Sequence, residues 1–149
     1  MLMCSKIKTK ELSKTLQQAA QKAFADYPII SAYLYGSQVR GRNLSPSDID
    51  VAVYIDPEVF PLSLDVELGL CVRLEEASGL SNIDLRILNE APLSFQGEVL
   101  RQGIEIYSAD EGKRILFETH TLDAFLDYLP HLEKLRRAFL HSVAEKGIL

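Results

Sequence analysis

The sequence predicts an α/β (α+β) fold in which helices flank a small sheet. Short β-rich apolar runs bounded by turn residues predict strands, and apolar residues spaced by three and four predict helices. The two patterns alternate along 149 residues without a repeat, a low-complexity tract or a linker. The whole chain, 1–149, is therefore expected to form a single domain.

The first half of the chain opens with a predicted helix. Apolar residues recur at helical spacing over residues 12–24, and Pro28 ends the run. The β-rich stretch Ile29–Tyr35 predicts a strand that a glycine terminates. A second strand is expected to run up to the turn at Asp56-Pro57.

The second half continues the alternation. Pro61 suits the first position of a second helix, and Gly79 suits its C-terminal cap. The alternating run Asn82–Leu88 predicts a third strand. A helix over residues 92–103 and a short strand over residues 104–107 complete the expected sheet.

A helical segment over about residues 109–146 is expected to end the chain. Residues 108–111 fit a capping box that would start it, and Pro130 is expected to kink it or divide it in two. Its apolar stripe is expected to pack on the sheet or on the first helix. The alternative is a partner-binding surface, because further apolar residues lie outside the stripe. The stripe consists of Leu122, Phe125, Leu129, Leu132, Leu135, Phe139 and Val143, and the residues outside it are Leu116, Phe117, Leu126, Tyr128 and Leu140.

Composition limits the possible partners. Sixteen basic and twenty-one acidic residues give a net charge of −5, which argues against direct binding of nucleic acid. Cys4 and Cys71 have neither the spacing of a metal site nor that of a disulfide framework. No apolar run is typical of a signal peptide or a membrane span, so a cytoplasmic protein without a membrane partner is expected.

A small-residue turn is the first sign of a functional site. Gly36-Ser37 follows directly after a predicted strand. A short helix starting there would direct free backbone N–H groups and the Ser37 hydroxyl at an anion such as phosphate. Arg40 and Arg42 add positive charge to the same loop. We therefore expect these four residues to bind a nucleotide.

Three carboxylates are the second sign. Asp48 and Asp50 follow Ser37 after a gap of ten residues and share one face of a strand, because the side-chain period of a strand is two. Asp84, in the third predicted strand, adds another. Carboxylates repel phosphates unless a cation such as Mg²⁺ lies between them. A Gly-Ser pair alone is usually a turn and an Asp-x-Asp alone is often a solvated strand end, but the combination favours a metal-dependent nucleotide site.

This combination resembles the signature of the DNA polymerase β nucleotidyltransferase superfamily and, within it, of the minimal nucleotidyltransferases. The resemblance covers nearly the whole chain and implies a polymerase-β-like fold with a small mixed sheet. Many members continue Gly-Ser with an Arg, where this chain has Gln38. The signature of Gly-Ser, a ten-residue gap, Asp-x-Asp and a later strand Asp is matched by Gly36, Ser37, Asp48, Asp50 and Asp84.

The resemblance implies a reaction. An acceptor hydroxyl would attack the α-phosphorus of ATP, the substrate, and pyrophosphate would leave. Asp48 and Asp50 would hold two Mg²⁺ ions, while Asp84 would complete the shell of one ion and help to accept the hydroxyl proton. Ser37, the backbone beside it and Arg40 would hold the β- and γ-phosphates.

The resemblance also implies a partner. The chain is most similar to MntA-type antitoxins of HEPN/MNT (type VII) toxin–antitoxin pairs, which transfer AMP to a tyrosine of a HEPN-domain ribonuclease toxin. A protein adenylyltransferase (AMPylase) of that kind is the expected function, because the chain has no room for an acceptor-binding domain of its own. Two alternatives remain open: transfer to a small-molecule hydroxyl such as that of an aminoglycoside, and a non-catalytic antitoxin that acts by occlusion through its C-terminal helix.

Overall fold

A mixed sheet lies at the centre of the fold in the computed structural model, which describes residues 2–36, 39, 48–60 and 65–147. Within these ranges the sheet has four strands in the order β3-β2-β1-β4. β1 pairs antiparallel with both β2 and β4, whereas β2 and β3 run parallel. The predicted mixed sheet is confirmed. Its strands are β1 (Ile29–Tyr35), β2 (Ile49–Ile55), β3 (Ile83–Ile87) and β4 (Ile104–Ser108).

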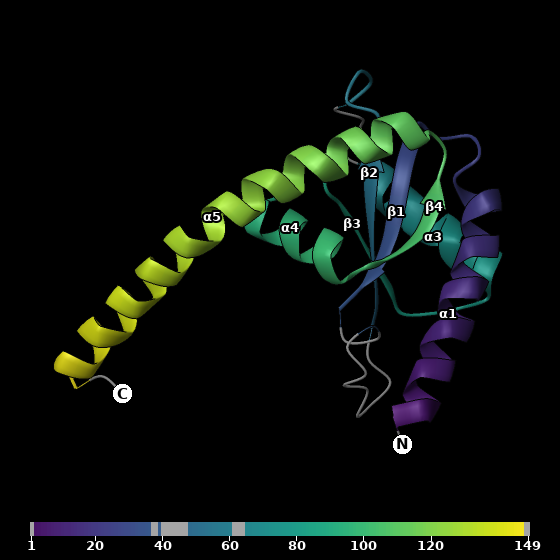
Figure 1. Cartoon of the computed structure of the whole chain (residues 1–149). Helices are drawn as coiled ribbons and strands as arrows, with labels where there is room; N and C mark the ends of the chain where they lie inside the picture. The colour runs from purple at the N-terminus through teal and green to yellow at the C-terminus, as the bar shows by residue number, and fades with distance from the viewer. Residues whose placement is uncertain (1, 37–38, 40–47, 61–64, 148–149) are drawn as a thin grey trace.

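Helices cover both faces of the sheet, as the sequence predicts (Figure 1). α1 and α3 pack on one face, and α4 and the first part of α5 pack on the other. None of the described helices is long and apolar enough to cross a membrane. The helices are α1 (Leu2–Ala23), α3 (Val66–Ser78), α4 (Leu93–Gln102) and α5 (Glu111–Glu145).

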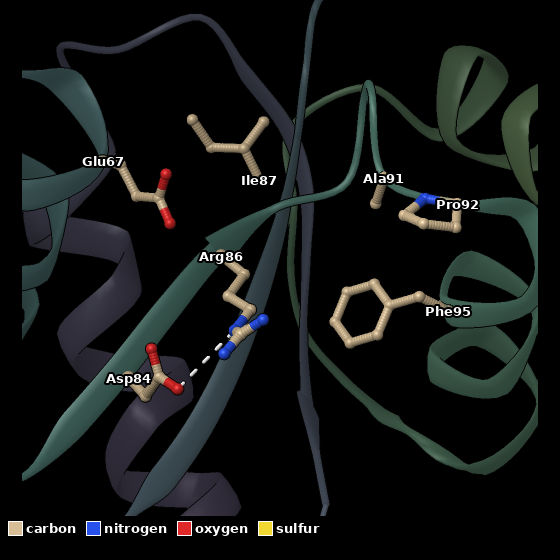
Figure 2. A pocket seen from close by; sticks show the side chains of 7 residues that line it. All are labelled: Glu67, Asp84, Arg86, Ile87, Ala91, Pro92 and Phe95. Atoms are coloured by element: carbon tan, nitrogen blue, oxygen red, sulfur yellow. Dashed lines mark ion pairs between the residues drawn. The ribbon is translucent and has the colours of Figure 1, made fainter. Parts of the chain in front are cut away.

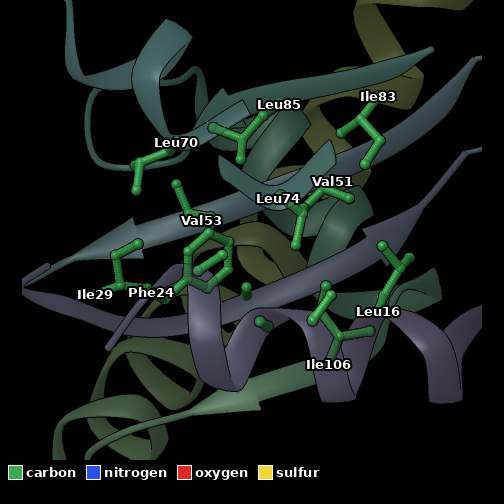
Figure 3. Packing of buried hydrophobic residues seen from close by; sticks show 14 of the residues in the cluster. Leu16, Phe24, Ile29, Val51, Val53, Leu70, Leu74, Ile83, Leu85 and Ile106 are labelled. Carbon is green, nitrogen blue, oxygen red and sulfur yellow. The ribbon is translucent and has the colours of Figure 1, made fainter. Parts of the chain in front are cut away.

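The larger core lies between the sheet and the pair α1 and α3 (Figure 3). Val51 and Val53 of β2 point into it because alternate residues of a strand face the same side. Phe24, directly after α1, and Leu74 of α3 are fully buried in the same cluster. Burying each such side chain contributes about 1.5–3 kcal/mol. The hydrophobic alternation of β2 therefore directs its acidic residue Asp50 to the opposite face.

The structure tests some of the predicted helix boundaries. The predicted start at Pro61 lies outside the described residues, and α3 as described begins at Val66. Its end is as predicted, because Gly79 takes the left-handed conformation (φ 72°) and its N–H donates to the carbonyl of Glu75. At α5 the predicted capping box is wrong. Asp110 is the N-cap and accepts from the N–H of Lys113 at 3.0 Å, because β4 continues through Ser108.

α5 is a single helix of 35 residues with Pro130 inside it. Of the two outcomes expected at Pro130, a division into two helices is wrong, and a kink stays a prediction. Proline removes one backbone hydrogen bond from a helix, and the residue four positions earlier, whose carbonyl loses its partner, is the exposed Leu126. Phe125, in the first half of the stripe, is buried as expected, but it packs against Gly97 of α4, a surface that the sequence did not predict. The second half extends away from the sheet (Figure 1), and its residues Leu132, Leu135 and Phe139 are exposed.

Candidate active site

A row of three polar side chains crosses three neighbouring strands at one end of the sheet. Asp50 of β2 is the register partner of Tyr35 on β1 and of Asp84 on β3. Register partners point to the same face, and neighbouring strands lie about 4.8 Å apart. Asp48, which is exposed, directly precedes β2. The fold therefore brings the three predicted carboxylates to the same end of the sheet.

Gly36 closes one side of this row. It follows β1 with a φ of 83°, which L side chains rarely adopt. A Cβ atom built on it would collide with the Asp50 carboxylate, whose Cγ would lie 3.1 Å away and whose Oδ2 would lie closer still. The backbone N–H of Val39 donates to the Gly36 carbonyl at 3.1 Å, so the chain turns at this glycine. Only glycine lets that turn pass so close to Asp50.

Asp84 lies at the other side of the row and pairs with Arg86, two residues along β3. The Arg86 Nε and Asp84 Oδ2 atoms are 3.6 Å apart (Figure 2). Both residues line a cavity of about 510 Å³, which places the third carboxylate where a ligand has room to bind. The cavity is lined by Glu67, Asp84, Arg86, Ile87, Ala91, Pro92 and Phe95.

Tyr35 reports the electrostatics of the site. Burial, followed by the charge of Asp50, raises the pKa of its hydroxyl to about 12. The charges of Asp84 and Glu67 also raise this pKa, and the charge of Arg86 lowers it. Three acidic residues and one basic residue therefore act on the Tyr35 hydroxyl. The Tyr35 ring also meets Phe95 of α4 edge-on, with centroids 5.5 Å apart and planes at 85°. A neutral tyrosine thus stands between the carboxylates and α4.

Sequence reasoning missed part of this site. Arg86 was recognisable as sharing a face with Asp84, because the strand period is two, but not as a residue that lines a cavity. Nothing local in the sequence indicates Tyr35, Glu67 or Phe95, because they reach the carboxylates only through the packing of β1, α3 and α4.

Three predicted nucleotide-binding residues, Ser37, Arg40 and Arg42, lie outside the described residues. Among the residues that the structure does describe, no three His, Cys, Asp or Glu side chains are gathered tightly enough to hold a metal ion. The donor set nonetheless fits Mg²⁺, which prefers one or two carboxylates and keeps several waters. Asp50 and Asp84 occupy adjacent register positions on one face and provide such carboxylates.

Several solved structures share the fold. A chain in a crystal structure of a toxin–antitoxin pair with AMP-PNP is 23% identical, with a TM-score of 0.63 over 86% of this chain and 98% of that chain. A chain in the structure of the tri-AMPylated Shewanella oneidensis HEPN toxin in complex with MNT antitoxin is 22% identical, with a TM-score of 0.59 over 89% and 98%. For the MntA-HepT toxin–antitoxin structure the identity is 21% and the TM-score 0.59, over 87% and 97%.

The sequence itself also has a family match. No curated protein matches the chain. The family described as Polymerase beta, Nucleotidyltransferase matches residues 14–112, a stretch that includes the glycine turn, β2 and β3. This match covers more than half of the 149 residues and contains all three carboxylates. The chain therefore belongs to the polymerase beta nucleotidyltransferase family.

Proposed function

We propose that this protein transfers AMP from ATP to a hydroxyl, that of a tyrosine, on a HEPN-type ribonuclease toxin and so acts as its antitoxin. The observation that carries the proposal is the register of Asp50 with Asp84, beside a glycine turn that passes close to Asp50. Family membership supports the nucleotidyl transfer. The toxin–antitoxin complexes of similar fold support the choice of a protein partner.

The carboxylates have distinct roles in the proposed reaction. Asp48 and Asp50 would hold two Mg²⁺ ions, and Asp84 would complete the shell of one of them. Mg²⁺, when bound, would stabilise charge on the attacking and leaving oxygens. Asp84, on β3 at one edge of the sheet as described, would accept the proton of the acceptor hydroxyl.

The turn after β1 would hold the leaving group. The left-handed Gly36 exposes the backbone beside Asp50, and a backbone without a Cβ admits a phosphate closely. Ser37, Arg40 and Arg42 would add a hydroxyl and two guanidinium groups that hold the β- and γ-phosphates. Pyrophosphate would therefore leave on the β1 side of the sheet.

A transfer assay tests the proposal. The protein is incubated with ATP, Mg²⁺ and the product of the adjacent gene, and intact-mass spectrometry should detect the added mass of AMP on that product. Asp48→Asn combined with Asp50→Asn should abolish the adduct. Asp26→Asn combined with Glu76→Gln removes the same charge from exposed positions outside α5 and should leave it intact. The proposal fails if the wild-type protein adds no AMP to an otherwise active toxin.

The exposed apolar residues of α5 favour a second candidate, neutralisation by occlusion. Leu126, Leu135 and Phe139 are each more than half exposed, and such a surface is typical of a protein–protein contact. The double carboxylate variant separates the two candidates, because it should lose transfer while keeping its fold. Full protection of cells by that variant would favour occlusion over catalysis.

A further inference from the structure

A second cavity lies at the opposite end of β2 from the carboxylates, where the first turns of α5 cross the sheet (Figure 1). We call it the distal pocket. Tyr54, which lines it, follows Asp50 by four residues on the same face of β2, a separation of about 13 Å. It shares no lining residue with the cavity beside Asp84. The residues that matter here are Tyr54, Asp56, Glu58, Lys113, Leu116 and Phe117.

Part of the distal pocket is apolar. The rings of Tyr54 and Phe117 are half-buried and stack with centroids 3.8 Å apart and planes at 9°. Leu116 extends this apolar surface and is 57% exposed. The volume of about 340 Å³ lies at the lower end of the range of ligand pockets, which is about 300–1,000 Å³. The distal pocket therefore suits one long side chain better than a whole nucleotide.

The charged part of the distal pocket is acidic. Lys113 contacts Asp56 at 2.8 Å and Glu58 at 3.7 Å. The hydrogen bond with Asp56 raises the pKa of Lys113, and the charges of Asp56, Glu58 and Asp110 raise it further. One lysine shared by three carboxylates leaves two negative charges unmatched within this group. The Glu58 side chain is 81% exposed, so its carboxylate is open to a ligand.

The next residue of α5 repeats this imbalance. Arg114 pairs with Glu105 at 3.4 Å, with Glu111 at 2.6 Å and with Glu118 at 3.0 Å. Three carboxylates again share one cation. The start of α5 thus has an acidic field, which attracts cationic groups and repels anionic ones. Charge complementarity favours a cationic occupant for the distal pocket.

We propose that the distal pocket is a docking site for a partner protein and that it receives an arginine side chain flanked by apolar residues. The aliphatic stem of the arginine lies along Leu116, and its guanidinium reaches Glu58. The inference goes beyond the transfer reaction, because none of these residues belongs to the site around Asp50. A partner held here leaves the row of carboxylates uncovered.

Arginine suits the distal pocket better than the other occupants do. Its guanidinium is planar and weakly hydrated, so it packs on aromatic rings such as those of Tyr54 and Phe117 more readily than an ammonium group does. Its parallel N–H groups can donate two hydrogen bonds to one carboxylate, here that of Glu58. A nucleotide would bring further negative charge to an acidic surface. A second copy of this chain, with a net charge of −5, would do the same.

A binding experiment tests the distal pocket. The isotope-labelled full chain is titrated with the peptide acetyl-Gly-Leu-Arg-Leu-Gly-amide and with the same peptide carrying citrulline, an uncharged isostere of arginine, while backbone amide shifts are followed by NMR. Glu58→Gln removes the charge, and Glu76→Gln, at an exposed position of α3, is its matched control. Leu116→Ala shortens the apolar surface, and Leu68→Ala, 70% exposed on α3, is its matched control.

We expect the arginine peptide to shift the amides of residues 54–58 and 113–121. Its binding should weaken about two- to fivefold in Glu58→Gln, the range of a surface ion pair. It should weaken about fivefold in Leu116→Ala, which loses buried apolar area, and stay unchanged in both controls. The citrulline peptide should bind the wild type about two- to fivefold more weakly than the arginine peptide does.

Several results would overturn the proposal. They are equal binding of the two peptides, equal binding by Glu58→Gln and Glu76→Gln, and the absence of shifts at residues 54–58 and 113–121. Tighter binding of adenosine at these amides would show a small-molecule site instead. Shifts that appear with rising protein concentration and no peptide would show that a second copy is the occupant. The titrations contain neither ATP nor Mg²⁺, so their outcome is independent of the transfer assay.

Discussion

The hydroxyl of Tyr33, on the central strand β1, donates a hydrogen bond to a carboxylate oxygen of Glu118 on α5 at 2.7 Å. Both oxygens of Glu118 also accept from the Arg114 guanidinium at 3.0 Å. Ser31 lies within hydrogen-bond distance of the same tyrosine hydroxyl, at 3.0 Å. This polar network, on the face that also carries the site, attaches the first turns of α5 to the sheet.

The network makes stability depend on pH at the alkaline end. Burial raises the pKa of Tyr33 well above its usual value, a shift that the hydrogen bond with Ser31 opposes and Glu118 reinforces. Because the folded-state pKa is raised, the stabilisation is complete below the unfolded pKa of about 10 and is lost as pH rises above it. Tyr33→Phe should cost about 1–3 kcal/mol at pH 8 and lose less stability than the wild type at about pH 11. Urea unfolding at the two pH values measures this, and parallel losses would contradict it.

The contact between α4 and α5 should tolerate no extra methyl group. A Cβ on Gly97 would overlap the ring of Phe125, with Cδ1 only 2.7 Å away and two further ring carbons closer. Gly97→Ala should therefore destabilise the fold by about 1–3 kcal/mol in urea unfolding. Gly69→Ala on α3 is the control, because the added carbon meets no atom within 4 Å apart from its chain neighbours and the backbone of its own helix. It should be neutral or stabilise by up to about 1 kcal/mol. Equal effects of the two substitutions would refute the packing argument.

Gly36→Ala should impair the site more than the fold. The positive φ alone costs about 1–2 kcal/mol for an alanine, and Gly79→Ala, at a φ of 72° in open space, measures that cost separately. At Gly36 the added carbon also displaces the Asp50 carboxylate. A misplacement of about 1 Å lowers a rate by about 100-fold, so AMP transfer should fall by that factor in Gly36→Ala and stay near wild type in Gly79→Ala. Similar transfer rates in both variants would count against the role of Gly36.

Asp84→Asn should separate chemistry from stability. Loss of a group that accepts the acceptor proton lowers the rate by about 10²–10⁴. The side chain of Asp84 is 42% exposed, so the free energy of unfolding should change by no more than about 0.5 kcal/mol. Glu76→Gln, at an exposed position of α3 outside the cavity, makes the same charge change and should retain full transfer. Steady-state transfer kinetics and urea unfolding of both variants decide the matter.

The two halves of α5 should respond differently to truncation of a phenylalanine. Phe125 is 1% exposed and Phe139 is 66% exposed. Phe125→Ala should destabilise by about 3–5 kcal/mol, whereas Phe139→Ala should stay within about 0.5 kcal/mol. Thermal or urea unfolding of the isolated chain measures both. A large loss of stability in Phe139→Ala would mean that the second half of α5 packs on the body of the protein.

Much of the site could be predicted because its carboxylates obey local rules. The strand period alone assigned Asp50 to the face opposite Val51 and Val53, and it assigned Asp84 to the face shared with Arg86. Strand order and direction could not be derived from composition or period, because they depend on pairing between distant segments. The position of Phe95 in the site could not be predicted for the same reason, because only the packing of α4 on the sheet brings its ring to Tyr35.

The errors at α5 have a different physical origin. Asp and Ser are both good N-caps, so the choice of Asp110 depended on where β4 ended. The apolar stripe indicated burial along its full length, but only the turns around Phe125 are covered, and Gly97 of α4 is part of what covers them. A periodic pattern identifies an amphipathic face without identifying what covers it.

Because β2 and β3 pair in parallel register, the packing of the core also fixes the position of the site carboxylates. A slip of β3 by one residue would turn Asp84 and Arg86 inward and Leu85 outward, because every side chain of the strand would change face. Leu85 is 4% exposed, and its burial opposes such a slip. The leucine that fills the core thus also keeps Asp84 opposite Asp50. When Leu85 is buried in the core during folding, Asp50 and Asp84 are therefore also brought into register.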